Sequence, residues 1–395
     1  MKQKWKEIIK KIFYILHINP QSILYFYKKF FQHDVLYNVH KTQYKKNCLL
    51  QYIVQPFLEK EINRYRHQNQ WQVKVLVDEL GNFGYNVDVR DIEDTGKRLK
   101  HKYDLVVDIH IGLNTTYKKY MNSGCRWIAY LTGMNPRVAN HNEQIRLEAL
   151  TQRRGIVLPP ERQGPLLSRE VEKCDAFFFI GNAYNLKSYE EFHLPPVYFI
   201  KNHGYNFPFM IDYTCKDPKK FLFFASVGQV HKGLDLLLEI FSKKDFSFEL
   251  YVCSDFLSER EFCAEYQQEL FHTSNIHPIG FIDIMGQEFH HIVEVCSFLL
   301  MPSCSEGIAG SVLTGMSAGV IPIVSRECGF EEDEVFHLQD CRMETIENAI
   351  RYFGNQDKRW IQEKATYTKN IVKERYSEED FIQSVRQALE KILKD

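Results

Sequence analysis

Residues Phe298 to Ser325 read FLLMPSCSEGIAGSVLTGMSAGVIPIVS, in which two apolar runs enclose a loop and a segment of helix length. The first run predicts a buried strand that delivers Glu306 into the loop, and the second run predicts the next strand. Small residues in the loop let backbone N–H groups approach an anion closely before a helix begins. A strand, a helix and a second strand in this order are the unit of a parallel α/β sheet.

A second informative stretch, Phe221 to Phe241, reads FLFFASVGQVHKGLDLLLEIF. Its apolar strand ends at Ser226 to Gly228, and a short loop carries Lys232 to a helix that opens at Gly233. Because a helix N-terminus carries partial positive charge, a strand-to-helix turn with free N–H groups and a lysine can hold a phosphate. A lone lysine before a helix is more often solvated. This stretch therefore indicates a phosphate site only in combination with the first stretch.

The rest of the chain repeats this alternation, which predicts an α/β protein of two doubly wound, Rossmann-like domains. We expect a basic aromatic arm over 1–46, a first domain over 47–205, a linker over 206–220, a second domain over 221–375, and a C-terminal helix over 376–395 that crosses back to the first domain. Two such sheets face each other across a cleft at their C-terminal ends, where open α/β sheets bind ligands. The expected strands are Cys48–Val54, Tyr85–Val89, Asp104–Ile109, Arg126–Leu131, Ala176–Ile180 and Val197–Ile200, then Phe221–Val227, Phe248–Cys253, Ile276–Ile279, Phe298–Met301 and Val320–Val324; one helix is expected over Glu259–Leu270.

Composition excludes several classes of protein. The 395 residues, 44% of them hydrophobic, suit two domains, and no apolar run approaches the roughly 20 residues of a membrane-spanning helix. The ten cysteines stand singly without a C-x-x-C pair, so neither a zinc site nor a disulfide framework is indicated. A net charge of -1 argues against a nucleic-acid partner, and lysines interrupt any apolar signal segment near Met1. We therefore expect a cytoplasmic protein with no metal and no nucleic-acid partner.

Taken together, in this order and spacing, the two stretches resemble the donor-binding half of the group 1 family of retaining glycosyltransferases, which have the GT-B fold. In that family the first stretch reads roughly strand-G-R-x-x-x-x-K-G-x-D and the second P-S-x-x-E-G-x-x-x-x-x-x-E-A-x-A-x-G-x-P-V. The resemblance covers Phe221 to Ser325 well and the N-terminal half only loosely. The resemblance implies an enzyme that needs no cofactor and uses a nucleotide-sugar donor. We expect this donor to be a UDP-sugar or a GDP-sugar.

The same resemblance assigns roles to individual residues. Lys232 would hold the donor diphosphate and Glu306 would bind hydroxyl groups of the donor sugar, so we expect both in the catalytic site. The turn at Gly280 and Phe281 would frame the nucleobase. The remaining expected donor contacts come from the two loops and the helix that follows, namely Ser226, Gly228, Gly307, Ile308, Ala309, Gly310, Ser311 and Thr314.

Two positions depart from the family pattern. Val227 stands where the family usually has arginine, so one of two phosphate-binding cations is missing. Thr314 stands where a glutamate usually holds the ribose, and a neutral hydroxyl bonds less strongly than a carboxylate. Because of these departures, an alternative function remains: a non-catalytic GT-B scaffold or binding protein in glycan assembly. A nucleotide-sugar epimerase on the same fold is a further alternative.

The N-terminal half contributes weaker candidates. His110 ends a strand at the cleft edge, where related enzymes often place a histidine near the reacting sugar, so we expect it in the catalytic site. Arg146, Arg153, Arg154 and Arg162 are concentrated on the cleft side. Guanidinium groups match phosphate geometry, so these arginines would recognise an anionic acceptor or replace the missing donor cation. The alternative is a solvated helix face or intramolecular ion pairs.

The N-terminal arm is strongly basic. From Met1 to Lys46 it holds ten lysines against Glu7 and Asp34, a net charge of +8, while Trp5 and five further apolar residues up to Leu16 form one helical stripe. Basic amphipathic helices lie in membrane interfaces. This predicts peripheral contact of residues 1–31 with the inner face of a membrane, and a glycan or lipid-linked acceptor in bacterial-type surface polysaccharide assembly. The alternative is a helix packed on its own domain.

Overall fold

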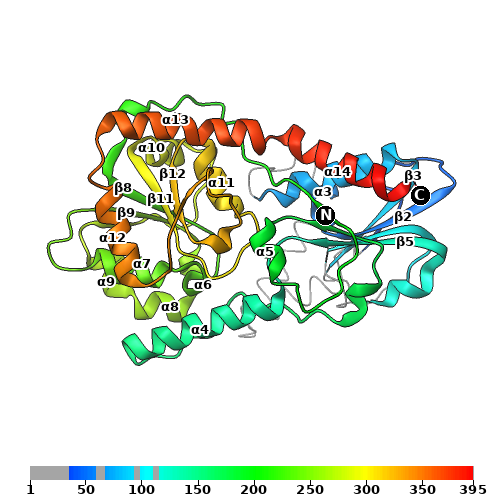
Figure 1. Cartoon of the computed structure of the whole chain (residues 1–395), viewed down its shortest axis with the longest axis horizontal. Coiled ribbons are helices and arrows are strands. Elements are labelled where there is room, and N and C mark those ends of the chain that lie inside the picture. The colour runs from blue at the N-terminus through cyan, green and yellow to red at the C-terminus, as the bar shows by residue number, and fades with distance from the viewer. Residues whose placement is uncertain (1–34, 59–66, 93–97, 110–114, 395) are drawn as a thin grey trace, which may run out of the picture.

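The computed structural model of the chain describes residues 35–58, 67–92, 98–109 and 115–394. These residues form two α/β domains arranged side by side along the long axis of the molecule (Figure 1). The first contains a seven-stranded sheet in the order β1-β3-β2-β4-β5-β6-β7, and the second a six-stranded sheet in the order β10-β9-β8-β11-β12-β13. The basic arm before Val35 lies outside the described residues, so its helix and its membrane contact stay predictions.

The first sheet is parallel apart from its edge strand β1, which pairs antiparallel with β3. Its central strands are buried on both faces, which explains why they read as continuous apolar runs. The strands are β1 (Val35–Leu36), β2 (Lys46–Tyr52), β3 (Tyr85–Asp91), β4 (Tyr103–Asp108), β5 (Met121–Leu131), β6 (Ala176–Phe179) and β7 (Val197–Phe199), and the helices are α3 (Asn69–Asn82), α4 (Pro136–Arg154) and α5 (Ala183–Lys187).

The second sheet is parallel throughout. Strands β8 and β11 are neighbours, and the strand order reverses between them, which is where open α/β sheets bind ligands. The strands are β8 (Asp217–Phe224), β9 (Glu249–Cys253), β10 (Ile276–Pro278), β11 (Cys296–Met301), β12 (Ile321–Val324) and β13 (Phe336–His337); the helices are α6 (Gln229–Lys232), α7 (Leu234–Phe241), α8 (Arg260–Glu265), α9 (Gln267–His272), α10 (Gln287–Val295), α11 (Gly310–Ser317), α12 (Met343–Phe353), α13 (Lys358–Arg375) and α14 (Glu378–Leu393).

The elements differ from the sequence prediction at a few boundaries. Strand β8 begins at Asp217, inside the range expected as linker, and ends at Phe224, so Ala225 to Gly228 form a loop. The helix expected over Glu259–Leu270 is split into α8 and α9 at Tyr266, whose buried ring stacks on Phe262.

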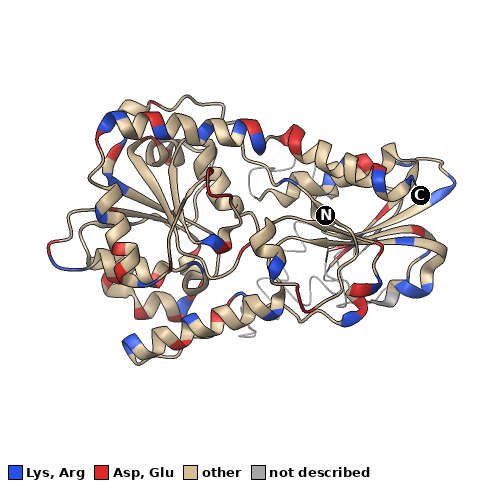
Figure 2. Ribbon diagram, viewed as in Figure 1, with Lys and Arg blue, Asp and Glu red and all other residues tan. Residues whose placement is uncertain are grey.

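Each domain extends a helix onto the other. Helix α14 leaves the second domain and packs on α3, where the Arg386 guanidinium pairs with the Glu79 carboxylate at 2.9 Å (Figure 1). Helix α4 of the first domain runs along the second domain, with basic and acidic positions interspersed along it (Figure 2). The two domains are therefore held together at two separate places.

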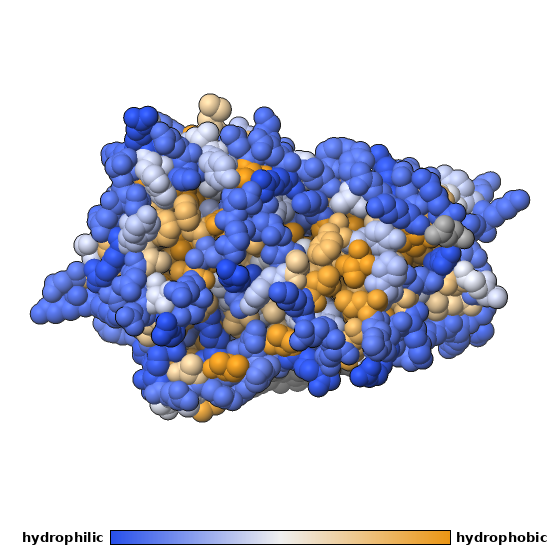
Figure 3. Space-filling model, in the orientation of Figure 1, coloured by the Kyte–Doolittle hydropathy of each residue, from blue (hydrophilic) through white to orange (hydrophobic). Residues whose placement is uncertain are grey.

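The surface is mainly hydrophilic on the outer helices. Figure 3 shows apolar side chains gathered where this face of the molecule is hollowed. No helix of the described residues has both the length and the apolar character needed to cross a membrane.

Candidate active site

Lys232 and Glu306 meet at the C-terminal edge of the second sheet. Lys232 is the last residue of α6, which follows β8, and Glu306 lies in the loop that follows the neighbouring strand β11. Their side chains form an ion pair and are 6% and 14% exposed, and the Ser303 hydroxyl donates to the same Glu306 oxygen at 3.1 Å. The structure therefore brings together the two residues that the sequence places at separate strand ends.

Gly233 allows this approach. It has a φ of +81°, and a Cβ on it would lie 2.8 Å from the carbonyl oxygen of Pro302. Only glycine combines this left-handed backbone with so close a neighbour. The turn between α6 and α7 (Leu234–Phe241) thus presses against the chain that leads into the Glu306 loop.

The charge state of Glu306 is set by competing effects. Burial raises the pKa of its carboxyl, but the positive charges of Lys232 and Arg162 outweigh burial and lower the pKa to about 2. The neighbouring His231 is 4% exposed, and burial lowers its pKa, so its ring is neutral near pH 7. Its Nε2 donates to the Ser305 carbonyl at 2.7 Å and fixes the loop beside Glu306. At neutral pH the site therefore contains one ionised carboxylate next to a lysine.

The loop from Gly307 to Ser311 lies at the interface between the domains. A Cβ on Gly307 would come within 2.6 Å of the carbonyl oxygens of Thr132 and Ile180, both at strand ends of the first sheet, so this position requires glycine. The Ala309 amide donates to the Cys328 carbonyl at 3.0 Å, and the Ile308 carbonyl accepts from Asn202. The Ala309 amide is thus already bonded within the protein, and the donor contact expected of Ala309 stays a prediction.

Gly310 and Ser311 open α11, where a helix presents its N–H groups. An anion bound at this helix start would accept from the two amides, so their donor contacts stay predictions. The Thr314 hydroxyl, by contrast, donates to the Gly310 carbonyl at 2.9 Å, and the residue is 4% exposed. The hydroxyl proton of Thr314 is thus bonded within its own helix, and only the acceptor side of the oxygen is left for a ribose, so this contact stays a prediction.

Glu259 occupies the turn after β8. Its carboxylate accepts from the backbone N–H of Gly228 at 2.5 Å and of Gln229 at 3.1 Å. A carboxylate of the protein thus occupies the Gly228 amide in this arrangement, and the donor contact expected of Gly228 stays a prediction. Ser226, one turn earlier, is exposed, and its carbonyl accepts from the Gln229 side chain.

Gly280 and Phe281 follow the end of β10, at the same edge of the sheet but separated from β11 by the two strands β9 and β8. Gly280 has a φ of +87°, and Phe281 is 66% exposed. The ring is thus accessible for stacking, while its contact with a nucleobase stays a prediction. His110 lies outside the described residues.

The four arginines of the first domain separate into two groups. Arg153 pairs with Asp235 at 2.6 Å, Arg154 with Glu269 at 2.7 Å, and Arg146 donates to the Pro302 carbonyl at 2.7 Å. These three hold α4 against the second domain, as the alternative of intramolecular pairs predicts. Arg162 differs, because its side chain lies on Gly228, where an added Cβ would be 2.9 Å from the Arg162 Cδ.

A cavity of about 670 Å³ lies next to this site. Its walls include Glu143 and Leu158 of the first domain and His231, Leu257 and Glu259 of the second. Lys232 and Glu306 do not line it, whereas Gly228 and His231, which precede Lys232 in the chain, do. Across the described ranges, no three His, Cys, Asp or Glu side chains are grouped so as to hold a metal ion.

Sequence reasoning missed three of the residues that shape this site, Glu143, His231 and Glu259. His231 stands one position before Lys232, which was a usable signal, whereas Glu143 and Glu259 stand in segments of ordinary helical composition.

Part of the chain is similar to a known protein family, and its fold is similar to that of solved structures. Residues 218–352, from β8 to α12, match the family described as "Glycosyl transferases group 1". No curated protein is significantly similar to the chain in sequence. Among solved structures, sucrose-phosphate synthase from Thermosynechococcus elongatus is similar with a TM-score of 0.60 at 11% identity, covering 88% of this chain and 100% of that one.

Two further solved structures have the same architecture. The lipopolysaccharide outer core galactosyltransferase WaaB in its apo form has a TM-score of 0.56 at 13% identity, over 88% of this chain and 99% of that one. HepE of Anabaena, in complex with UDP and glucose, has a TM-score of 0.51 at 11% identity, over 88% and 99%. Residues 218–352 therefore match the group 1 glycosyl transferase family, and the chain as a whole has the GT-B fold.

Proposed function

We propose that this glycosyltransferase moves a sugar from a UDP- or GDP-sugar to a glycan or lipid-linked acceptor, with retention at the anomeric carbon, in surface polysaccharide assembly. The observation that carries the donor assignment is the Lys232–Glu306 pair at the point where the strand order reverses. The UDP and glucose of the Anabaena structure and the lipopolysaccharide role of the galactosyltransferase support the choice of donor and pathway class.

Lys232 and Glu306 would divide the work on the donor. The ammonium of Lys232 faces the charge that develops on the departing diphosphate, and a fixed cation in a buried site stabilises such charge strongly. The Glu306 carboxylate accepts hydrogen bonds from sugar hydroxyl groups and so positions the reacting carbon. The bond from the anomeric carbon to the diphosphate breaks, the bond to the acceptor oxygen forms on the same face, and the acceptor proton leaves with the diphosphate.

The ion pair between Lys232 and Glu306 is suited to the donor-free state of the site. Without a donor, the carboxylate of Glu306 compensates the buried charge of Lys232. When a donor binds, its phosphates replace the carboxylate beside Lys232 and its hydroxyl groups occupy Glu306. Since Lys232 supplies the positive charge, we propose that transfer needs no metal and no cofactor. The contact of residues 1–31 with the inner face of a membrane belongs to the same proposal.

One alternative comes from specific observations. Val227, Thr314 and the Glu259 carboxylate on the Gly228 amide all weaken the donor site relative to the family pattern, and this favours a non-catalytic GT-B scaffold or binding protein. An epimerase on the same fold would convert its donor without an acceptor.

A panel of UDP-, GDP- and ADP-sugars, read by thermal shift and then by product analysis with and without acceptor, tests the proposal. A donor that binds the folded state raises the melting temperature, and the transferred product should appear only with acceptor. Glu306→Ala should abolish most transfer, whereas Glu79→Ala, which removes an interdomain ion pair away from the site, should preserve it. No binding to any nucleotide sugar would contradict the proposal, and conversion without acceptor would identify an epimerase.

A further inference from the structure

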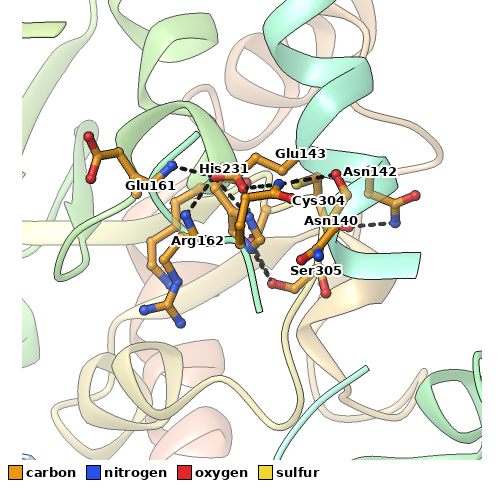
Figure 4. A network of polar contacts seen from close by, with 12 residues as sticks. Asn140, Asn142, Glu143, Glu161, Arg162, His231, Cys304 and Ser305 are labelled. Carbon is orange, nitrogen blue, oxygen red and sulfur yellow. Dashed lines mark hydrogen bonds and ion pairs between the residues drawn. The ribbon is translucent and has the colours of Figure 1, made fainter. Parts of the chain in front are cut away.

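The backbone around Arg162 is fixed to helix α4. The Glu143 carboxylate, 2% exposed on α4, accepts from the backbone N–H of Glu161 at 3.1 Å and of Arg162 at 2.9 Å. Its second oxygen accepts from the Gln163 side chain at 2.7 Å. Figure 4 shows this cluster, with Glu143 between the Glu161–Arg162 segment and His231. A buried carboxylate thus holds Arg162 in one place.

The side chain of Arg162 reaches across to the second domain. Its methylene groups lie on Gly228, in the loop between β8 and α6. In Figure 4 its guanidinium points away from the Glu143 cluster. Within the part of the chain that the structure describes, no carboxylate pairs with this guanidinium, in contrast to Arg153 and Arg154 on the same side of the domain.

Two cations, Lys232 and Arg162, act on the space around Glu306. The charge of Lys232 is matched by that of Glu306, whereas the charge of Arg162 has no carboxylate partner among the described residues. Arg162 is nevertheless close enough to lower the pKa of Glu306, so its charge acts on the same space. A nucleoside diphosphate sugar has two negative phosphates, and a guanidinium offers two parallel donors to such a group.

We propose that Arg162 binds the donor diphosphate from the first domain, opposite Lys232 of the second, and supplies the cation that Val227 does not. This inference rests on the proposed function, because it needs a nucleotide-sugar donor between Lys232 and Glu306. A donor held in this way bridges the two domains. Its binding therefore stabilises the closed arrangement in which α4 lies against the second domain.

The test compares Arg162→Ala, Arg162→Lys and a charge-matched control, Arg169→Ala, which removes an exposed arginine of the first domain that pairs with Glu172. Calorimetry measures the affinity for UDP, GDP and the nucleosides uridine and guanosine. Arg162→Ala should weaken binding of the nucleoside diphosphate by about 10- to 100-fold, because charge-assisted hydrogen bonds are lost. Arg162→Lys should recover part of this loss, and nucleoside binding should change by less than about twofold, as should all binding to Arg169→Ala.

The outcomes separate this inference from the proposed function. If the wild type binds UDP or GDP, Lys232→Ala loses that binding and Arg162→Ala keeps it, the role of Arg162 is overturned and the proposed function stands. An equal loss for nucleoside and nucleoside diphosphate also overturns it, because a phosphate contact would not affect the nucleoside. A wild type that binds neither UDP nor GDP contradicts both. An unchanged melting temperature of Arg162→Ala shows that the loss is not one of folding, as the exposure of this side chain leads us to expect.

Discussion

Lys232 and Glu306 form an ion pair across 74 residues of sequence. The pair exists because β8 and β11 are neighbours in a parallel sheet, so the chain segments that follow them emerge at the same edge. The contact of Gly233 with Pro302 then closes the remaining space between α6 and the Glu306 loop. Two features thus form the site: the order of the strands in the sheet, and the close approach that Gly233 allows.

The first prediction concerns pH. The folded pKa of Glu306 lies below its ordinary value of 4.5, so its ionised form adds stability that is complete above pH 4.5 and is lost as the pH falls toward 2. Glu306→Gln should therefore lower the free energy of unfolding by about 3 kcal/mol at pH 7 and by less at pH 3. Urea unfolding of both proteins across this range measures the difference, and a gap independent of pH would contradict the ionised pair.

A second prediction concerns Glu143 as a positioning residue. Glu143→Ala frees the backbone of Arg162, so the affinity for UDP or GDP should fall a few-fold. Because Glu143 acts through Arg162, the double variant should bind no more weakly than Arg162→Ala alone. Calorimetry on the three variants gives this cycle. Additive losses would show that Glu143 affects the site by another route.

The third prediction concerns the contact between α4 and the second domain. Asp235 is fully buried, and burial raises its pKa to about 6 even beside Arg153. Arg153→Ala would remove the guanidinium that pairs with this carboxyl, and should lower the free energy of unfolding by about 3 kcal/mol. The control Arg351→Ala breaks an exposed pair with Glu347 and should cost less than about 1 kcal/mol. Equal losses in chemical unfolding would mean that the α4 contact adds little.

The exposed ring of Phe281 gives a fourth prediction. A nucleobase stacked on it would gain about 1–3 kcal/mol, so Phe281→Ala should weaken UDP or GDP binding about tenfold without lowering the melting temperature. Tyr352→Ala, which truncates an equally exposed ring on α12, is the control. If the two variants bind the nucleotide alike, the base lies elsewhere.

Much of the fold can be read from the sequence, because strands buried on both faces are continuous apolar runs. Strands β2 to β12 were predicted in this way, and the GT-B arrangement is confirmed. Strands β1 and β13 were missed since each has only two residues and shows no pattern. The break at Tyr266 was missed because it depends on packing against Phe262.

The site was predictable at the level of strand ends but not of hydrogen-bond partners. The juxtaposition of Lys232 and Glu306 follows from sheet topology. The Gly228 amide bonds to Glu259 and the Ala309 amide to Cys328. Both partners come from other segments of the chain, so the local sequence does not predict them. Likewise, four arginines looked alike, and only the arrangement of the second domain distinguishes Arg162 from the others.

A crystal structure with UDP or GDP bound tests the central claim most directly. We expect the diphosphate within hydrogen-bond distance of the Lys232 Nζ and of the amides of Gly310 and Ser311, with Glu306 facing the space beyond the β-phosphate. A nucleotide bound only in the 670 Å³ cavity, which neither side chain lines, would contradict the account.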